Sequence, residues 1–547
     1  MKPLLLAGLA AGVLACGPAV AEPLLTLRVK PTDLDVPHGK AVLDVSLTLA
    51  GAAIPAGAPV LVHTKSGPAV RLPFQVLDLA ASDDRGALAL VSKDGGRTYV
   101  ADRDVVGTLK ASYRRPIDAA AGGSISTIPT VDGPGVSGIA NMLFALPSAA
   151  SAYHVKLDWD LSAFPAGSEV LTSLGDGEHL DIPSVSAERL SFTMLMVGKI
   201  QREPNPATGA FTAVWTGQPS FDLRGAMRWA GKLHGHMSQF FQDDRKLPYH
   251  VFVRAHARTT GTAVPMAFTL GYNTETTPEN VEHLLGHEMT HTWTANDLDK
   301  WYTEGNAVYY QTLLPWRFGM MSAQQRLEDL NQTAARYYTN DMIGRPDSEI
   351  LPKFWSDVRY NVLPYDRGAI YFAVLNGKVL RASRGKRSVD DLIRRMVLLA
   401  RDGQTLTEQT WIGLLQKELG EEGPAIHKAM MSGQTLVPDS DAYGPCFRRV
   451  AVKIPRFDVG FGPPGVNPPA VVADLRADSN AAKAGLKDGD KLQYLPGSTA
   501  AQRDPKALEH VRVTRGDQTF EVSFLPRGEL RDAYQWERTA VPESACK

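Results

Sequence analysis

Two histidines four residues apart, His287 and His291, constrain the fold of this chain more than any other feature. Residues four apart share one face of an α-helix, so both imidazoles can reach one ion if this segment is helical. Apolar residues at helical spacing precede the pair and predict that helix: Val281, Leu284 and Leu285. Glu288 completes the pattern H-E-x-x-H, in which the histidines can hold zinc and the carboxylate can reach a water on the ion. The same pattern also arises by chance on ordinary amphipathic helices.

A zinc site of this kind needs a third protein ligand, and Glu304 is the best candidate. Twelve residues separate Glu304 from His291. That spacing is long enough to end the first helix, turn through residues 295–299 and begin a second helix. A carboxylate on the second helix would complete a site of two histidines and one glutamate for a single zinc ion.

The chain has 547 residues, which is too long for one hydrophobic core, so about three or four domains are expected. Lys and Arg together number 58 and Asp and Glu 59, so no basic excess indicates a nucleic-acid partner. We expect a multidomain α+β protein.

The first residues have the features of an export signal. Lys2 is followed by a short apolar stretch over residues 4–14, and Ala19-Val20-Ala21 forms a cleavage motif before Glu22. A signal peptide is therefore predicted over residues 1–21, with the mature protein in the periplasm or secreted. Cys16 could instead carry a lipid, and only then would a membrane hold the chain.

Two cysteines remain once Cys16 is set aside. Cys446 and Cys546 can pair in an oxidising compartment, which would fasten the C-terminal tail to the start of the last domain. The alternative is two unpaired thiols.

Residues 22–221 are predicted to form a β-rich N-terminal domain. Alternating apolar and polar residues indicate half-buried strands over 25–29, 41–49 and 153–161. Gly and Pro interrupt these runs, and a sandwich-like arrangement is expected.

Residues 222–450 are predicted to form a mainly helical domain that contains the metal site. Helical spacing of apolar residues recurs over 224–241, 322–337 and 387–401. A strand is predicted over 266–272, directly before the zinc helix. We expect it to be the edge that pairs with a peptide substrate, the alternative being an ordinary structural strand.

A tyrosine near such a site can donate its hydroxyl to a developing oxyanion. Spacing alone does not choose between Tyr309, Tyr310 and Tyr365 for this role.

Residues 451–547 are predicted to form a PDZ domain with a C-terminal tail. A short helix leads into the turn Ala484-Gly485-Leu486, and Gly489-Asp490 leads into a strand, which is typical of PDZ domains. Residues 460–462 are the expected loop that binds the terminal carboxylate of a peptide ligand. The alternative is a structural domain whose groove is blocked.

These motifs together resemble the glycyl aminopeptidase family of gluzincin zinc metallopeptidases. The resemblance rests on HEMTHTW, WYTEG, YDRGA, RSVDDLIRRM and the PDZ-like segment, and it covers most of the mature chain. It implies a thermolysin-like catalytic domain with His287, His291 and Glu304 on zinc. It also implies Glu288 as the catalytic base and Tyr365 as the oxyanion donor.

Three features depart from that family. The family has a G-G-x-E-H stretch before the zinc helix, whose glutamate holds the substrate's amino terminus, whereas this chain reads AFTLGYN there. Thr294 stands where the family has asparagine, and the spacer before Glu304 is shorter. Aminopeptidase action with a glycine preference is therefore implied only by the resemblance.

The sequence thus predicts an exported zinc metallopeptidase acting on peptides or proteins, of the glycyl aminopeptidase type. Two alternatives stay open. One is a zinc endopeptidase, which the absent glutamate would permit. The other is a catalytically weak scaffold whose PDZ domain captures C-terminal peptides.

Overall fold

A computed structural model of the chain describes residues 22–63, 74, 76–118, 127–204, 210–256, 259–264, 267–295, 298–462, 470–492, 501 and 504–546. The predicted signal peptide over 1–21, with its cleavage motif and Cys16, lies outside the described residues. None of the described helices is both long and apolar enough to cross a membrane.

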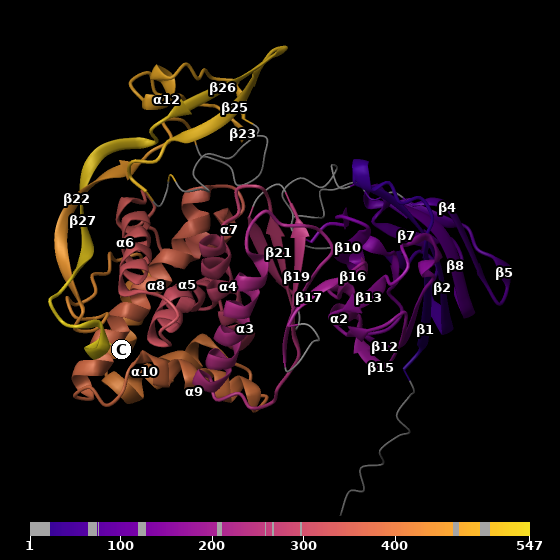
Figure 1. Cartoon of the computed structure of the whole chain (residues 1–547), viewed down its shortest axis with the longest axis horizontal. Helices are drawn as coiled ribbons and strands as arrows, with labels where there is room; N and C mark the ends of the chain where they lie inside the picture. The colour runs from indigo at the N-terminus through magenta and orange to yellow at the C-terminus, as the bar shows by residue number, and fades with distance from the viewer. Residues whose placement is uncertain are drawn as a thin grey trace, which may run out of the picture.

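The N-terminal region contains three β-sheets that share one apolar core (Figure 1). Along the strands Leu24–Pro31 and Lys40–Ile54 buried residues alternate with more exposed ones, as the alternating sequence pattern predicts. The largest sheet has the order β15-β12-β1-β2-β8-β4-β5, formed by β1 (Leu24–Pro31), β2 (Lys40–Ile54), β4 (Leu77–Asp83), β5 (Gly86–Ala87), β8 (Val105–Asp118), β12 (Ala152–Trp159) and β15 (His179–Ser186).

Two smaller sheets complete this region. The first, in the order β11-β3-β7-β6, consists of β3 (Pro59–Val62), β6 (Leu90–Lys93), β7 (Thr98–Ala101) and β11 (Leu146–Pro147). The second, in the order β14-β13-β16-β10-β9, consists of β9 (Thr130–Val131), β10 (Gly135–Ile139), β13 (Glu169–Thr172), β14 (Gly175–Asp176) and β16 (Met194–Gly198).

A fourth sheet, in the order β17-β18-β19-β21-β20, lies between this region and the helices. Its strands are β17 (Gln201–Glu203), β18 (Phe211–Trp215), β19 (Tyr249–Ala255), β20 (Thr260–Val264) and β21 (Ala267–Tyr272). Strands β18 and β19 are parallel, as are β19 and β21, whereas β20 runs antiparallel to β21. The predicted division at residue 221 follows β18, so this sheet combines strands from both sides of it.

The prediction that residues 266–272 form the free edge is wrong. Its described residues, 267–272, form β21, which pairs with β19 on one side and with β20 on the other. The edge is β20, a short strand of Thr, Gly, Ala and Val with mostly half-buried residues, so it lacks the apolar alternation that would have identified it.

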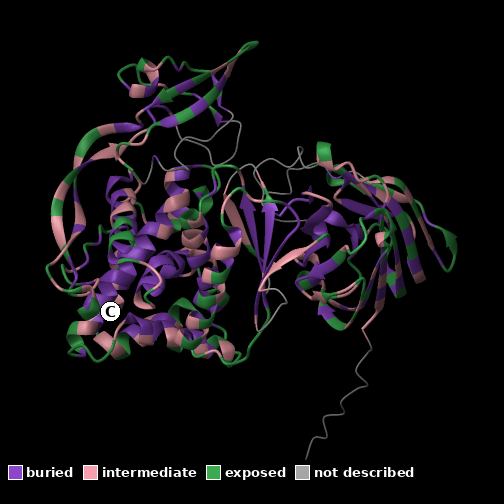
Figure 2. Ribbon diagram, in the orientation of Figure 1, coloured by how far each residue is buried: buried purple, intermediate pink, exposed green. Residues whose placement is uncertain are grey.

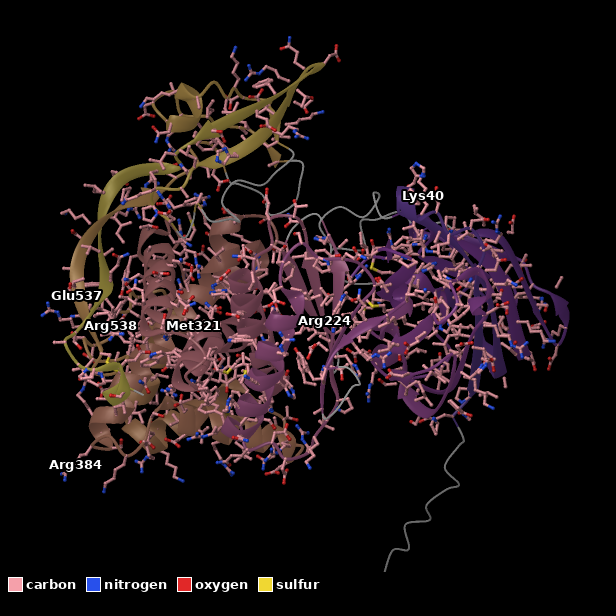
Figure 3. The ribbon with its side chains drawn as sticks, viewed as in Figure 1. Lys40, Arg224, Met321, Arg384, Glu537 and Arg538 are labelled. Carbon is pink, nitrogen blue, oxygen red and sulfur yellow. A yellow bond between two sulfur atoms is a disulfide. The ribbon has the colours of Figure 1, made fainter. Side chains whose placement is uncertain are left out.

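The helices of the next part follow this sheet along the chain, except α3, which lies between β18 and β19. They are α3 (Leu223–Phe240), α4 (Pro278–Thr294), α5 (Lys300–Arg317), α6 (Ala323–Thr339), α7 (Ile350–Lys353), α8 (Val358–Ala382), α9 (Val389–Arg401), α10 (Glu408–Leu419) and α11 (Glu422–Met431). Arg224, labelled in Figure 3, ties α3 to β17 by donating to the Arg202 carbonyl at 3.1 Å. A mixed α+β chain with a β-rich N-terminal region and a helical part after it is confirmed.

The C-terminal part begins with a long two-stranded ribbon, β22 (Phe447–Phe457) and β27 (Arg527–Arg538), which packs against α6. Its inner residues, including Ile454 and Trp536, belong to the core of the helical part. Its outer face is charged: Arg448 pairs across the ribbon with Glu537, which Figure 3 labels.

The ribbon carries a small separate unit at its far end. Its elements are β23 (Ala470–Val471), α12 (Asn480–Lys483), β24 (Lys491–Leu492), β25 (Glu509–Arg515) and β26 (Gln518–Phe524). These elements enclose an apolar core of their own, and Figure 2 shows their buried residues apart from those of the helices. The predicted pairing of Cys446 with Cys546 is confirmed: a disulfide joins them, with Cα atoms 5.4 Å apart.

Candidate metal centre

Helix α4 presents His287 and His291 on the same face. The Thr277 hydroxyl begins the helix by accepting the Asn280 N–H at 3.3 Å. Its opposite face is buried in the apolar core through Val281, Leu285 and Met289. The two imidazole rings lie 5.1 Å apart between centroids and line a cavity of about 780 Å³.

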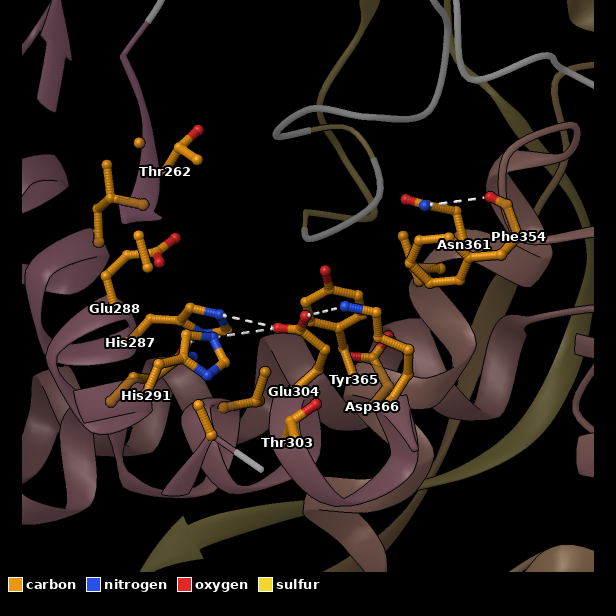
Figure 4. Close-up of a pocket in the computed structure, with 18 of the residues that line it drawn as sticks. Thr262, His287, Glu288, His291, Thr303, Glu304, Phe354, Asn361, Tyr365 and Asp366 are labelled. Atoms are coloured by element: carbon orange, nitrogen blue, oxygen red, sulfur yellow. Dashed lines mark hydrogen bonds and ion pairs between the residues drawn. The ribbon is translucent and has the colours of Figure 1, made fainter. Parts of the chain in front are cut away.

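Helix α5 brings Glu304 to the two histidines (Figure 4). The Glu304 Oε2 lies 3.5 Å from His287 Nε2 and 3.3 Å from His291 Nε2. Lys300, one turn earlier, donates to the other carboxylate oxygen at 2.9 Å. Burial raises the pKa of Glu304, but hydrogen bonds with the two histidines outweigh burial and hold that pKa well below its usual range.

This donor set fits a zinc ion. The candidate ligand atoms of the three residues all lie within 4.8 Å of one another. Two imidazole nitrogens and one carboxylate oxygen are the donors of a catalytic zinc site that keeps one position open for water or substrate. The structure therefore brings together the three residues that the sequence predicts as ligands.

A second layer of polar contacts orients His287. Its Nδ1 lies 3.2 Å from Gln311 Oε1, and the Gln311 amide donates to Asp329 at 2.7 Å. Thr312 and Arg326 hold the other Asp329 oxygen, at 2.5 and 3.2 Å. When Nδ1 donates its proton to Gln311, Nε2 carries the lone pair that a metal requires.

Sequence reasoning missed this layer. Gln311 comes from α5 and Asp329 from α6, and no short spacing motif links either residue to His287. His283, one turn before His287, also contacts Asp329, at 2.9 Å from Nε2 to Oδ1.

Glu288 lines the same cavity, and Figure 4 shows its carboxylate on the pocket side of the two histidines. Burial raises the pKa of Glu288 above its ordinary value, in spite of the neighbouring histidines. A carboxylate with a raised pKa is a better proton acceptor, as a general base requires.

Among the three candidate tyrosines, Tyr365 is the one that lines this cavity. Its ring lies 6.0 Å from that of His287 between centroids, in a stacked orientation. Burial, followed by the charges of Glu304 and Glu288, raises its pKa well above the ordinary value, so the hydroxyl keeps its proton. Tyr309 and Tyr310 are buried away from the cavity, and the Tyr310 hydroxyl donates to Asp390 at 2.8 Å.

Glycines allow the helices that carry these residues to approach closely. A Cβ on Gly305 of α5 would lie 2.8 Å from the Gly368 Cα of α8, so neither position has room for a side chain. Gly305 follows Glu304, and Gly368 is three residues after Tyr365. The close helix crossing therefore places the carboxylate and the phenol beside the same cavity.

The cavity has two walls of different chemistry. One is the edge strand β20, through residues 261–263, and the other is apolar, formed by Phe354, Trp355, Val358 and Val362. Figure 4 shows Thr262 and Phe354 on opposite sides, with the metal ligands between them at the bottom.

No protein-family model and no curated protein matches the chain. Solved structures do. An aminopeptidase N family protein from Idiomarina loihiensis matches with a TM-score of 0.68 and 15% identity, over 94% of this chain and 98% of that one. An M1 zinc metallopeptidase from Deinococcus radiodurans matches with a TM-score of 0.48 and 18% identity, over 76% and 95% of the two chains. At such low identity the first likeness shows that the fold is shared along nearly the whole chain.

Proposed function

We propose that this chain is a zinc-dependent metallopeptidase. The observation that carries the proposal is the convergence of His287, His291 and Glu304 in a cavity that also holds Glu288 and Tyr365. The described residues thus bring together candidates for three metal ligands, a base and a hydroxyl donor, which are the parts that hydrolysis of a peptide bond requires.

The roles of the side chains follow from their positions. A zinc ion held by the three ligands would supply a Lewis acid that polarises the scissile carbonyl and acidifies a water molecule. Glu288 takes the proton of the attacking water and later delivers it to the leaving amine. Tyr365 donates its hydroxyl to the carbonyl oxygen as negative charge develops there. Gln311 keeps the His287 ring in the tautomer that leaves Nε2 available.

Aminopeptidase action is the first candidate, supported by the shared fold with the aminopeptidase N family protein and by the sequence resemblance to glycyl aminopeptidases. Such an enzyme must recognise the cationic amino terminus of its substrate, which a carboxylate in the cavity can do.

Endopeptidase action is the second candidate, and a specific observation favours it. Among the described residues that line the cavity, the acids are Glu288, Glu304 and Asp366. The first two have roles in the reaction, and Asp366 receives the Arg336 guanidinium on both oxygens at 3.0 Å. The edge strand β20 contains no acid. It offers backbone groups that can pair with an extended peptide at any point along its length.

The C-terminal unit fits a PDZ-like module, because a short helix and a four-stranded sheet enclose a separate core there. Its predicted carboxylate loop is partly engaged with the unit itself. The Gly460 N–H donates to Asp458 at 2.9 Å and the Gly462 N–H to the Ala473 carbonyl at 2.6 Å. We propose a structural role for this unit, with capture of C-terminal peptides as the alternative. We also propose export of the chain, which the signal-peptide pattern and the disulfide favour.

Cleavage of a mixed peptide library by zinc-loaded protein tests the proposed function, with mass spectrometry of the products. Each peptide is supplied with a free and with an acetylated amino terminus. We expect cleavage that a chelator abolishes and that Glu288→Gln lowers by about 10²–10⁴-fold while zinc content is kept.

The pattern of products separates the two candidates. Stepwise loss of N-terminal residues from the free peptides alone establishes an aminopeptidase. Internal cuts in both sets establish an endopeptidase. Absence of cuts by the zinc-loaded wild-type protein would refute the peptidase and favour a peptide-binding scaffold.

A further inference from the structure

The apolar wall of the cavity contains a large exposed aromatic side chain. Trp355 is 59% exposed, whereas the preceding Phe354 is 4% exposed. Both line the cavity that holds the metal ligands, and both lie in the turn between α7 and α8. An exposed tryptophan beside a reaction site is unusual, because burial of this side chain removes more apolar surface from water than burial of almost any other.

The turn that carries Trp355 is well anchored, so its exposure does not come from a loose segment. The Phe354 carbonyl accepts the Asn361 side-chain amide at 3.1 Å. The Phe354 ring packs edge-on against Trp355 at 4.9 Å and receives the Lys300 ammonium at 5.9 Å from its centroid. Lys300 also binds the metal ligand Glu304, so this turn is connected to the metal site itself.

The position of the wall determines what it can contact. Across the cavity, β20 offers an edge along which a substrate backbone can extend. Successive side chains of an extended peptide point to opposite faces of the sheet that it joins, so alternate side chains near the scissile bond enter the cavity. The surface available to them is the apolar wall of Phe354, Trp355, Val358 and Val362.

We propose that Trp355, supported by Phe354 and Val358, forms a subsite for a bulky apolar side chain next to the scissile bond. The substrates are then peptides with an aromatic or long aliphatic residue there, rather than peptides cleaved beside glycine. Glycine has no side chain to cover the indole. This inference rests on the proposed function and names the substrate class of the same site.

The test compares peptides that differ only in the residues flanking the cleaved bond, with Phe, Leu, Ala or Gly at each position in turn. We expect Trp355→Ala to lower kcat/KM for the Phe and Leu peptides at least about tenfold, mainly through KM. The Ala and Gly peptides should change by less than about twofold. Trp355→Phe should restore most of the preference, because it keeps an aromatic surface.

Leu351→Ala is the matched control. Leu351 is 43% exposed on the adjacent helix α7, but it does not line the cavity. Its substitution should leave the preference for Phe and Leu unchanged. A uniform loss across all peptides in Trp355→Ala, or no loss in any, would overturn the subsite.

A binding measurement separates failure of this inference from failure of the proposed function. Calorimetric titration of the Phe and Gly peptides into Glu288→Gln, with and without Trp355→Ala, needs no turnover. We expect the Phe peptide to bind more tightly only when Trp355 is present. If wild-type protein cuts nothing, the peptidase proposal fails, yet this titration still decides whether the subsite exists.

Discussion

His287 is the residue whose contacts show best how the candidate metal centre is maintained. Its Nε2 points to Glu304, and its Nδ1 is held by Gln311. Gln311 is 3% exposed and is held in turn by Asp329. Contacts at both nitrogens therefore fix the imidazole ring. The ring then loses less conformational entropy when a metal binds.

Gln311→Met should weaken zinc binding about 10–100-fold, because it removes the acceptor for His287 Nδ1 while keeping the size of the side chain. Competition with a chelating indicator measures this affinity directly. The control is Gln324→Met on the exposed face of α6, where the glutamine amide donates to Glu328 at 2.9 Å. Equal zinc affinity in the two variants would show that Gln311 does not orient the ligand.

At the scale of single residues, the sequence predicts the candidate site residues that lie on one helix. The spacing of His287, Glu288 and His291 follows from the periodicity of α4, and an intervening turn was sufficient to suggest Glu304. The contacts of Gln311 and Asp329 depend on how α5 and α6 pack, which spacing along the chain does not encode. Spacing alone did not choose Tyr365 over Tyr309; the family resemblance implied Tyr365, and the packing of α8 places it at the cavity.

Among the elements, the crossing of α5 with α8 is the contact on which the site depends most. The helices approach at Gly305 and Gly368, where a Cβ on either residue would overlap the opposite backbone. Tyr365 and Glu304 lie within three residues of this crossing. A wider separation of the two helices would therefore move the phenol away from the candidate metal ligands.

Gly368→Ala should lower the free energy of unfolding by about 1–3 kcal/mol, because the new methyl group forces the helix backbones apart. It should also lower peptidase activity through the displacement of Tyr365. Denaturant unfolding and peptide cleavage measure the two effects. Gly413→Ala is the matched control, since a Cβ there meets no atom within 4 Å in the middle of α10. Gly413→Ala should raise the free energy of unfolding by up to about 1 kcal/mol. Equal stability of the two variants would contradict the close crossing.

Element prediction succeeded where the apolar pattern is strong. Helices α3, α6 and α9 lie within two residues of their predicted ranges, and β12 lies within two residues of the strand predicted over 153–161. The short edge strand β20 was not predicted, because an edge strand needs no continuous apolar face. Because β20 was not predicted, its neighbour β21 was wrongly expected to be the free edge of the sheet.

The whole molecule is divided into parts with separate apolar cores. Ribbon residues such as Ile454 and Trp536 belong to the core of the helical part, whereas the C-terminal unit has its own. Strands β22 and β27 lie side by side where they enter that unit, with Phe457 opposite Arg527. The unit can therefore be removed without opening the core of the helices.

Replacing residues 458–526 with Asn-Gly, which closes the ribbon as a hairpin, should keep zinc binding and change the unfolding midpoint of the helical part by less than about 4 °C. Calorimetry and zinc analysis measure both quantities. Deletion of the entire ribbon, residues 447–538, is the control and should destabilise the helices by exposing their core. Loss of zinc from the hairpin variant would show that the small unit supports the metal centre.

The arrangement of the sheets lay beyond sequence reasoning. The alternation of residues 25–29 predicts a strand, but its parallel pairing with β12 joins segments more than a hundred residues apart. The sheet containing β17 to β21 likewise combines strands from both sides of the predicted division at residue 221. Such pairings are decided by long-range packing, which local patterns do not report.

The disulfide between Cys446 and Cys546 has a topological consequence. It closes the ribbon and the C-terminal unit into one covalent ring, with the rest of the chain attached at Cys446. A single cut by a protease within that ring opens it but releases no fragment, because both ends remain joined through the sulfur atoms. The two pieces would separate only after reduction or a second cut. In an oxidising compartment that contains proteases, this ring would keep a nicked molecule in one piece.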